Sequence, residues 1–231
     1  MSNKNPSLSI IVPIYNEEKF LKTFLPKIFQ LKLSQNVIII NDGSTDSSAT
    51  QLKKLAENYQ FRLLSLNSNS GKGSAIRLAL KYISSDYFIV CDADAEYDPN
   101  DIIKLWQKAL KSPNSKQVIY GSRWLGNYRW NWHFMVNKFL TTLTNQLFKS
   151  SLTDMETCFK LIPTVALKDV ILKSSGFEIE PELTAQLIKN GYPIKEVPIR
   201  YTRRGWRDGK KIGPRDGWLA IKTLIKQKLK H

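Results

Sequence analysis

The sequence predicts an α/β fold, in which helices cover both faces of a mostly parallel sheet within one domain over residues 1–231. Short apolar runs rich in β-branched residues alternate with helical patterns through the first 120 residues, which is the rhythm of a parallel sheet. The length allows a sizeable core, and the hydrophobic content of 42% is ordinary for a globular protein. No internal repeat or low-complexity linker divides the chain, so we expect one continuous domain.

The first half of the chain supplies most of the predicted sheet. Its apolar runs predict strands at Leu8–Val12, Val37–Ile40, Phe61–Leu66, Tyr87–Val90 and Val118–Tyr120. The helical patterns between them predict helices at Glu17–Leu31, Asp46–Asn58, Lys72–Ile83 and Pro99–Lys111. Turn and capping residues such as Asp46 and Pro99 mark where helices begin.

The alternation of strands and helices stops after residue 122. Beyond it we expect a strand at Cys158–Ile162, a helix at Pro181–Lys189, a strand at Ile194–Ile199 and a last helix from about Pro214. In the last helix an apolar face stands beside lysines at every fourth position: Trp218, Ile221, Ile225 and Leu229 against Lys222, Lys226 and Lys230. We therefore divide the domain into a first half (about 8–122), a second half (about 123–212) and a basic amphipathic helix (about 213–231).

Positive charge is concentrated in two stretches of the chain, whose formal net charge is +15. Residues 102–153 contain eight Lys or Arg and no acidic residue, and residues 200–231 contain eleven basic residues against two acidic ones. This pattern predicts a polyanionic partner, for which nucleic acid, anionic lipid headgroups and phosphorylated substrates all qualify. The alternative is that the lysines only keep the protein soluble.

The sequence lacks the marks of secreted and membrane-spanning proteins. Cys91 and Cys158 lie far apart in apolar surroundings, which is typical of reduced, buried thiols in a cytosolic protein. No secretory signal precedes the first apolar run, and no apolar stretch approaches the ~20 residues that a spanning helix needs. We therefore expect a cytoplasmic protein that does not cross a membrane by itself.

The most informative stretch is Cys91-Asp92-Ala93-Asp94-Ala95-Glu96, which directly follows the apolar run Tyr87–Val90. Alternate side chains of a strand point to one side, so Asp92, Asp94 and Glu96 should converge where that strand ends. So much negative charge is costly unless it is offset. A divalent cation, and through it a diphosphate, would offset it. The stretch therefore predicts metal-assisted chemistry on a nucleotide.

Polar motifs also follow the other predicted strands, and binding sites of open parallel sheets gather at strand carboxyl ends. Pro13-Ile14-Tyr15-Asn16-Glu17 follows the first strand, and Asn41-Asp42-Gly43-Ser44 follows the second. Asp42 can accept hydrogen bonds from a base or ribose, while Gly71-Lys72-Gly73 allows close backbone approach and supplies charge. Each motif alone is weak evidence for a nucleotide site. Asp-Gly-Ser is a common turn, and the two glycines lack the spacing of a P-loop or of a dinucleotide-binding motif. Their placement on successive strand ends favours a nucleotide site.

In order along the chain, these motifs resemble those of family 2 glycosyltransferases with the GT-A fold, whose sheet is Rossmann-like. The second half narrows the resemblance to dolichyl-phosphate mannose or glucose synthases, through five motifs: Gly121-Ser122-Arg123, Asp154-Met155-Glu156-Thr157-Cys158-Phe159-Lys160, Gly176-Phe177-Glu178 with Glu182-Leu183, Glu196-Val197-Pro198-Ile199 and Gly209-Lys210-Lys211-Ile212. The match runs from about Leu8 to Trp218. It departs from the mannose synthase pattern at Ala95-Glu96-Tyr97, which favours UDP-glucose over GDP-mannose as the donor, and it departs from related sequences at Arg203, where proline is common.

The resemblance implies an inverting enzyme that moves a hexose from a nucleotide sugar, UDP-glucose or GDP-mannose, to a polyprenyl phosphate such as dolichyl or undecaprenyl phosphate. It implies that Asp92, Asp94 and Glu96 hold Mg²⁺ or Mn²⁺ on the donor diphosphate, with Asp94 among the catalytic residues. The first half would then bind the nucleotide sugar, through Pro13, Tyr15, Glu17, Asp42, Lys72 and Asp92.

A polyprenyl phosphate carries its own nucleophile, a phosphate oxygen. This oxygen is largely ionised near neutral pH, because the second pKa of phosphate esters lies near ~6. Such an acceptor needs a cationic clamp rather than a strong base. The candidate clamp residues lie in or beside the family-like motifs: Arg123, Arg129, Arg204 and Lys211. Arg123 is also a catalytic candidate, and Asp154 is the remaining catalytic carboxylate, as a base or as the orienter of an arginine. A helix cap or a structural salt bridge is the alternative for Asp154.

Aromatic and basic residues are interleaved from Arg123 to Phe134, which is the composition of a segment at a membrane interface. The last helix has a similar composition. We expect peripheral binding to the cytoplasmic face of a membrane, or docking to a separate membrane-anchoring protein. In the alternative, these aromatic side chains fill the core under the acceptor loop.

Three other functions stay open. The same fold could transfer sugar to a saccharide or protein hydroxyl, and Arg123→Ala or Arg204→Ala would then leave turnover nearly intact. A basic nucleic-acid-binding protein could stack bases on the aromatic side chains, but the acidic triplet would repel nucleic acid, so we expect no such partner. A catalytically silent subunit that binds sugar nucleotides is disfavoured by the intact motifs.

Overall fold

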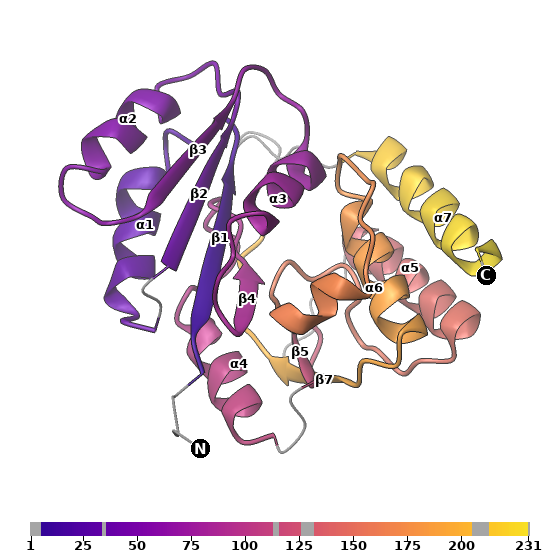
Figure 1. Ribbon diagram of the computed structural model, residues 1–231. Helices are drawn as coiled ribbons and strands as arrows, with labels where there is room; N and C mark the ends of the chain where they lie inside the picture. The colour runs from indigo at the N-terminus through magenta and orange to yellow at the C-terminus, as the bar shows by residue number, and fades with distance from the viewer. Residues whose placement is uncertain (1–5, 34–35, 113–115, 126–131, 205–212, 231) are drawn as a thin grey trace.

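A seven-stranded sheet runs through the protein in the order β3-β2-β1-β4-β6-β5-β7 (Figure 1). The structure is a computed structural model that describes residues 6–33, 36–112, 116–125, 132–204 and 213–230. The strands are β1 (Leu8–Ile14), β2 (Asn36–Asp42), β3 (Arg62–Leu66), β4 (Tyr87–Val90), β5 (Val118–Ser122), β6 (Lys160–Pro163) and β7 (Ile194–Pro198). Only β6 runs antiparallel to its neighbours in this sheet of the described residues. The prediction of a mostly parallel sheet is confirmed.

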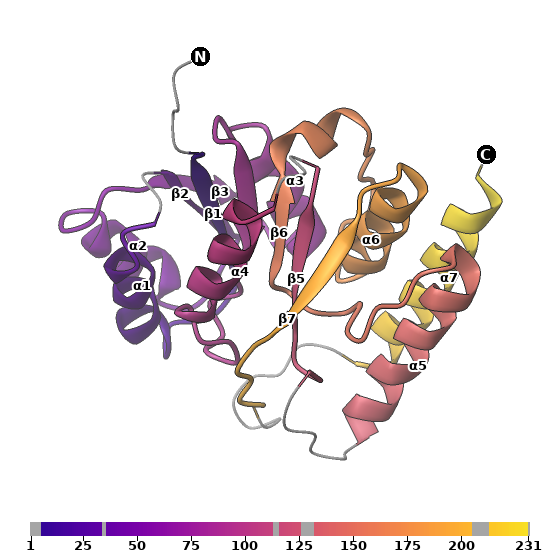
Figure 2. The ribbon, with the colours of Figure 1, turned by 90° about the horizontal axis from the view of Figure 1, so that it is seen from below.

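Helices cover both faces of the sheet, as predicted. They are α1 (Leu21–Gln30), α2 (Ser48–Leu55), α3 (Lys72–Leu80), α4 (Asp101–Leu110), α5 (Trp132–Phe148), α6 (Ile179–Lys189) and α7 (Pro214–Leu229), with a 3₁₀ turn, η1, at Thr164–Lys168. In Figure 2, α1, α2 and α4 lie on one side of the sheet, and α3 and α6 lie on the other. Helices α5 and α7 pack against each other and against α6, so they form an outer layer on that second side.

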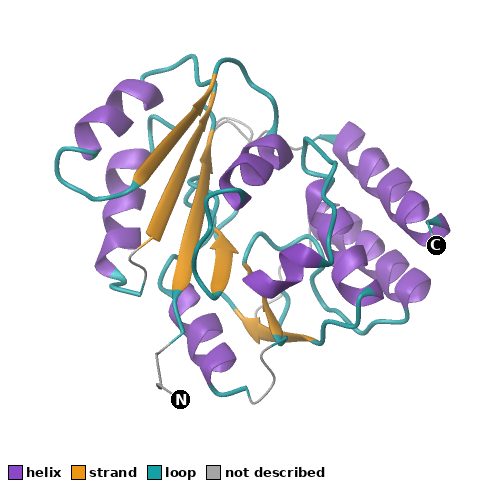
Figure 3. Cartoon of the chain, in the orientation of Figure 1, coloured by secondary structure: helices purple, strands orange, loops and turns teal. Residues whose placement is uncertain are grey.

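The centre of the sheet is apolar on both faces, because helices cover both. Strands β1 and β2 therefore carry continuous runs of buried Ile and Val instead of alternating polar residues. In register, Ile10 stands between Val37 of β2 and Ile89 of β4. This packing holds the carboxyl ends of β1, β2 and β4 at one edge of the sheet, which Figure 3 shows at the arrowheads of the strands.

The first two helices begin later than the sequence pattern predicts. Helix α1 begins at Leu21 and not at Glu17, and the backbone N–H of Glu17 donates to Ser48 Oγ at 3.0 Å. The N–H of Glu18 likewise donates to the Asp46 carboxylate at 3.1 Å. These contacts tie the loop after β1 to the start of α2.

The second half holds an element that the sequence pattern does not reveal. Residues 132–148 form helix α5, although aromatic composition led us to expect an interfacial segment there without assigning a helix. Phe134 and Leu140 are buried while Met135 and Phe139 are exposed. The helix is recognisable only from its packing on α6 and α7, which come much later in the chain. The functional boundaries near residues 122 and 213 stay a prediction.

The loop before α3 joins the two halves. Gly71 has a φ of +92°, in the region that favours glycine. A Cβ at this position would lie 2.4 Å from the carbonyl oxygen of Ser175, and the N–H of Ser74 donates to the same oxygen at 3.0 Å. The backbone of the first half therefore meets the loop before α6 without room for a side chain at Gly71.

We expect Gly71→Ala to lower the free energy of unfolding by at least about 2 kcal/mol, because it adds left-handed strain of about 1–2 kcal/mol to overpacking. Gly191→Ala is the matched control, because Gly191 also has a positive φ, of +73°, but nothing lies within 4 Å of its Cβ position. The free energy of unfolding of this control should fall only by the contribution of left-handed strain, about 1–2 kcal/mol. Urea unfolding followed by circular dichroism measures both, and equal losses would show that the contact with Ser175 imposes no constraint.

Candidate active site

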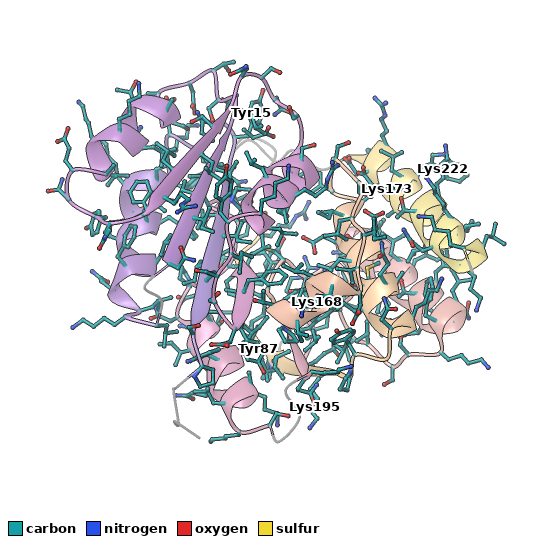
Figure 4. The ribbon with its side chains drawn as sticks, in the orientation of Figure 1. Tyr15, Tyr87, Lys168, Lys173, Lys195 and Lys222 are labelled. Carbon is teal, nitrogen blue, oxygen red and sulfur yellow. The ribbon has the colours of Figure 1, made fainter. Side chains whose placement is uncertain are left out.

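The carboxyl ends of β1, β2 and β4 open on a cleft of about 1690 Å³. Typical pockets for one small ligand measure roughly 300–1,000 Å³, so the cleft has room for two. Side chains from both halves of the chain line it, among them Tyr15, Asp94 and Arg123. In Figure 4, Tyr15 lies at this edge of the sheet, whereas Tyr87 marks the opposite end of β4.

The acidic triplet lies on the wall of the cleft directly after β4, where Asp92, Asp94 and Glu96 all line it. Burial and the neighbouring carboxylates of Asp92 and Glu96 raise the pKa of Asp94 to about 7. The backbone of Ala95, between them, is left-handed with a φ of +58°. Such conformations are uncommon outside glycine and gather at functional sites. The predicted concentration of negative charge is therefore present at the strand end.

Protein groups already contact all three carboxylates. Asp92 lies 2.8 Å from the ammonium of Lys72, and Asp94 lies 3.4 Å from the guanidinium of Arg204. The Glu96 carboxylate accepts hydrogen bonds from the Tyr201 hydroxyl at 2.8 Å and from the backbone N–H of Arg204 at 2.9 Å. Among the described residues no three acidic, histidine or cysteine side chains converge in a preassembled metal site. The oxygen donors of Asp92 and Asp94 nevertheless fit a hard cation such as Mg²⁺ or Mn²⁺.

Lys72, a predicted ligand of the nucleotide sugar, is buried between two carboxylates. Its ammonium lies 2.8 Å from Asp92 and 3.0 Å from Glu180, and Glu180 also binds the buried Lys160. Burial alone would lower the pKa of Lys72, but these acids raise it well above its ordinary value. We call Lys72, Lys160 and Glu180 the buried lysine cluster. Sequence reasoning missed Lys160 and Glu180, because β6 and α6 bring them to this place from far along the chain.

Arg204, a predicted ligand of the acceptor phosphate, lies among the acids of the donor side. Its guanidinium contacts Glu17 at 2.9 Å and stands 5.0 Å from the ring of Phe20. Together with the Asp94 contact, this places Arg204 at the junction of the predicted donor and acceptor regions. Glu17, a predicted nucleotide-sugar ligand, is correspondingly buried beneath it.

Arg123 and Asp154 form a buried, bidentate ion pair. Arg123 Nε and Nη2 each donate to the Asp154 carboxylate at 2.7 Å, and the Arg123 backbone N–H donates to it at 2.9 Å. Glu196 fixes the loop that carries Asp154 by accepting hydrogen bonds from two of its backbone N–H groups. With both of its oxygens engaged, Asp154 is better placed to orient Arg123 than to reach a substrate proton. Arg123 in turn lies 5.0 and 5.2 Å from the rings of Trp124 and Tyr201.

The remaining donor-side predictions lie on the loops after β1 and β2. Pro13, Tyr15 and Asp42 all line the cleft. The Asp42 carboxylate accepts the backbone N–H groups of Ser70 and Gly71 at 2.8 and 2.9 Å. Part of its hydrogen-bonding capacity therefore holds the loop before α3 in place.

One wall of the cleft is apolar and comes from α5 and α7. Phe139 of α5 and Trp218 of α7 line this wall, yet they are 57% and 67% exposed. Trp124 and Phe134, by contrast, are buried and pack edge to face with ring centroids 4.9 Å apart. The aromatic residues therefore divide: some fill the core beside the cleft, and others face outward from the outer helices.

Two predicted acceptor ligands, Arg129 and Lys211, lie outside the described residues, as does Trp130. In the other direction, the structure adds Glu156, which lines the cleft but carried no predicted role. The available signal was its position in the family-like motif that begins at Asp154.

Comparisons with known proteins agree with this geometry. The family model described as Glycosyl transferase family 2 matches residues 9–171. The dolichol-phosphate mannosyltransferase of Pyrococcus furiosus is 27% identical over 216 residues, which cover 89% of this chain and 59% of that protein; this chain thus spans about three fifths of that relative. The dolichyl-phosphate beta-glucosyltransferase of Dictyostelium discoideum is 29% identical over 250 residues, which cover 93% of this chain and 72% of that protein.

Solved structures share the fold at low sequence identity. Glucosyl-3-phosphoglycerate synthase from Mycobacterium tuberculosis, in complex with UDP, superposes with a TM-score of 0.76 at 18% identity, over 97% of this chain and 80% of that one. Its complex with Mn²⁺, UDP and phosphoglyceric acid gives a TM-score of 0.75 over 97% and 79%. The predicted GT-A fold is confirmed, and since the family model covers well over half of the chain, this protein belongs to the family 2 glycosyltransferases.

Proposed function

We propose that this glycosyltransferase moves a hexose from a nucleotide sugar to a polyprenyl phosphate. The observation that carries the proposal is that one cleft is lined both by the acids Asp92 and Asp94 and by Arg123, which Asp154 orients. The part around Asp92 and Asp94, which we call the metal end, suits a cation on a diphosphate, and the part around Arg123, the phosphate end, suits an anionic acceptor. The names of the relatives from Pyrococcus furiosus and Dictyostelium discoideum support a dolichyl phosphate acceptor.

On the donor side, Asp92 and Asp94 would hold Mg²⁺ or Mn²⁺, with Glu96 beside them. When bound, the cation stabilises the charge that develops on the leaving nucleoside diphosphate. The buried lysine cluster keeps the Asp92 carboxylate in place, and Pro13, Tyr15, Glu17 and Asp42 would border the nucleotide. The UDP complexes of the solved structures and the glucosyltransferase relative support UDP-glucose as the donor.

On the acceptor side, Arg123 would bind the phosphate that attacks the sugar. Nε and Nη2 bind Asp154, so the ion pair leaves Nη1 as the guanidinium nitrogen for a ligand. Its charge would offset the repulsion between the acceptor phosphate and the diphosphate, and hold the nucleophile in line behind the anomeric carbon. A phosphate monoester is largely ionised near neutral pH, so no separate base is required. Arg204, at the junction, would support either anion.

The exposed apolar side chains of the outer helices favour a lipid acceptor over a saccharide or protein hydroxyl. They form the α5–α7 face, which we define as Met135, Phe139, Trp218, Ile225 and Leu229 with the exposed lysines Lys222, Lys226 and Lys230. Figure 4 shows Lys222 on the outer side of α7. No helix in the part of the chain that the structure describes is long and apolar enough to cross a bilayer. We propose that this face lies on the cytoplasmic leaflet of a membrane or docks to a membrane-anchoring protein.

The reaction is tested with a panel of radiolabelled nucleotide sugars and polyprenyl phosphate, with and without Mg²⁺ or Mn²⁺. We expect lipid-extractable label from UDP-glucose, and its loss when the metal is chelated. Asp94→Asn should lower transfer by at least the roughly 10- to 100-fold that loss of a supporting group around a metal costs. Glu57→Gln, an exposed site after α2, should not. Absence of lipid-extractable label from every donor would overturn the proposal.

We expect Arg123→Ala to lower kcat/KM for transfer to polyprenyl phosphate by about 100-fold or more, as loss of a charge-stabilising donor does. Binding of UDP with metal, measured by calorimetry, should change little. Arg123→Lys should recover only part of the activity, because an ammonium cannot form the bidentate pair with Asp154. Arg62→Ala, at an exposed arginine of β3, is the control. Intact turnover in Arg123→Ala would favour a hydroxyl acceptor instead.

We expect the double variant Phe139→Ala, Trp218→Ala to bind vesicles containing anionic lipid at least about tenfold more weakly. Burial of one such side chain contributes roughly 1.5–3 kcal/mol. Cosedimentation at two salt concentrations measures the loss and separates it from the contribution of the lysines. Leu110→Ala is the control, because Leu110 is an exposed apolar residue of α4, on the other side of the sheet. Equal binding of all three proteins would remove the α5–α7 face from the membrane contact.

A further inference from the structure

Glu156 faces the cleft, and neither the metal end nor the phosphate end accounts for it. It lies between Asp154 and β6 in the chain and lines the cleft. Its Oε1 is buried and accepts no hydrogen bond from any described residue. A buried carboxylate oxygen without a donor is costly, and nearly all buried polar groups in proteins have a partner. At the wall of a binding cleft, the ligand is the natural source of that partner.

The charges around Glu156 come from both parts of the site. Burial raises the pKa of Glu156 to about 7, and the charges that act on it are those of Lys160, Glu180, Arg123 and Asp154. The neighbouring cations are engaged elsewhere, because Lys160 binds Glu180 and Arg123 binds Asp154. Glu156 therefore stands close to two cations without being the carboxylate that either of them pairs with.

The buried lysine cluster reaches the metal end through the contact of Lys72 with Asp92, and Arg123 marks the phosphate end. Glu156 lines the same cleft and is acted on by charges of both groups, so it would border the transferred sugar if the diphosphate binds near Asp92 and the acceptor phosphate near Arg123. Carboxylates accept hydrogen bonds from hydroxyl groups, and such charge-assisted bonds contribute about 1.5–3 kcal/mol. A sugar is rich in these donors, whereas the phosphates at either side have only acceptor oxygens near neutral pH.

We infer that the Glu156 carboxylate binds a hydroxyl group of the transferred hexose and thereby selects among donor sugars. The inference rests on the proposed function and deepens it, since it assigns a residue to the sugar itself and not to either anion. The selection follows from the cost of an unpaired group. A nucleotide sugar that lacks the bonded hydroxyl would leave Oε1 buried without a hydrogen bond, and its binding would therefore be much weaker.

The test distinguishes the contribution of the sugar to binding affinity from that of the nucleotide. Calorimetry with Mn²⁺ compares UDP and UDP-glucose binding to the wild-type protein, to Glu156→Gln and to Glu156→Ala. We expect UDP affinity to stay within about twofold, and UDP-glucose affinity to fall about tenfold or more in Glu156→Ala, which corresponds to the lower bound of one charge-assisted bond. Among monodeoxy analogues of UDP-glucose, one should bind wild type about tenfold more weakly but lose nothing further in Glu156→Ala, as expected for two partners of one contact.

Thr157→Val is the matched control. Thr157 Oγ1 is also buried without a hydrogen bond among the described residues, but Thr157 is not one of the described residues that line the cleft. This variant should keep the wild-type preference for UDP-glucose over its deoxy analogues. Thermal unfolding of Glu156→Gln, which preserves side-chain size, monitors folding and keeps the comparison valid if Glu156→Ala is unstable.

Three outcomes would overturn the inference. Equal losses of UDP and UDP-glucose would indicate a structural role, and unchanged affinity and sugar preference would show that Glu156 does not touch the hexose. Loss of turnover with unchanged donor binding would instead make Glu156 a base for a hydroxyl acceptor. Failure of the wild-type protein to bind any nucleotide sugar with metal would overturn the proposed function itself. This outcome can be told from the others because it is measured without any variant.

Discussion

The site depends on buried ion pairs that join segments far apart in the chain. The ammonium of Lys72, at the start of α3, lies between Asp92 after β4 and Glu180 of α6, and the guanidinium of Arg123, after β5, is held by Asp154. Removing one partner of such a pair leaves an uncompensated buried charge, which costs about 3–5 kcal/mol. The contacts of Lys72 therefore fix the loop after β4 relative to α6, and the Arg123–Asp154 pair fixes the end of β5 relative to the loop before β6.

In the proposed reaction, that constraint would let one cleft bind two anions. Acidic groups gather after β4, and burial together with the neighbouring carboxylates raises the pKa of Asp94 to about 7. Arg123, oriented by the buried carboxylate of Asp154, lines the same cleft, and desolvation would strengthen its attraction for a phosphate. Glu156 also lines this cleft, with a carboxylate oxygen that no described residue satisfies.

Local sequence patterns predicted the elements that are buried in the same way along their whole length. Strands β1, β2 and β4 are apolar on both faces, and their polar ends were correctly read as one edge of a parallel sheet. Helix α5 was missed because its periodicity is obscured by aromatic residues, and because the faces it buries are defined by α6 and α7. The antiparallel placement of β6 between β4 and β5 was also beyond reach, since pairing across some 70 residues leaves no local mark.

The fold class, the family-like motifs and the kinds of groups that face the cleft follow from local patterns, because periodicity and spacing are properties of neighbouring residues. Which of those groups are available to a ligand depends on how distant segments pack together. The sequence predicted both Lys72 and Asp42 as nucleotide ligands. In the structure Lys72 is buried between two carboxylates, and Asp42 holds the loop before α3. Glu156 attracted no prediction, and its unpaired oxygen emerged only from its three-dimensional surroundings. Hydrogen-bond satisfaction depends on every segment that packs around a group, and no local pattern encodes it.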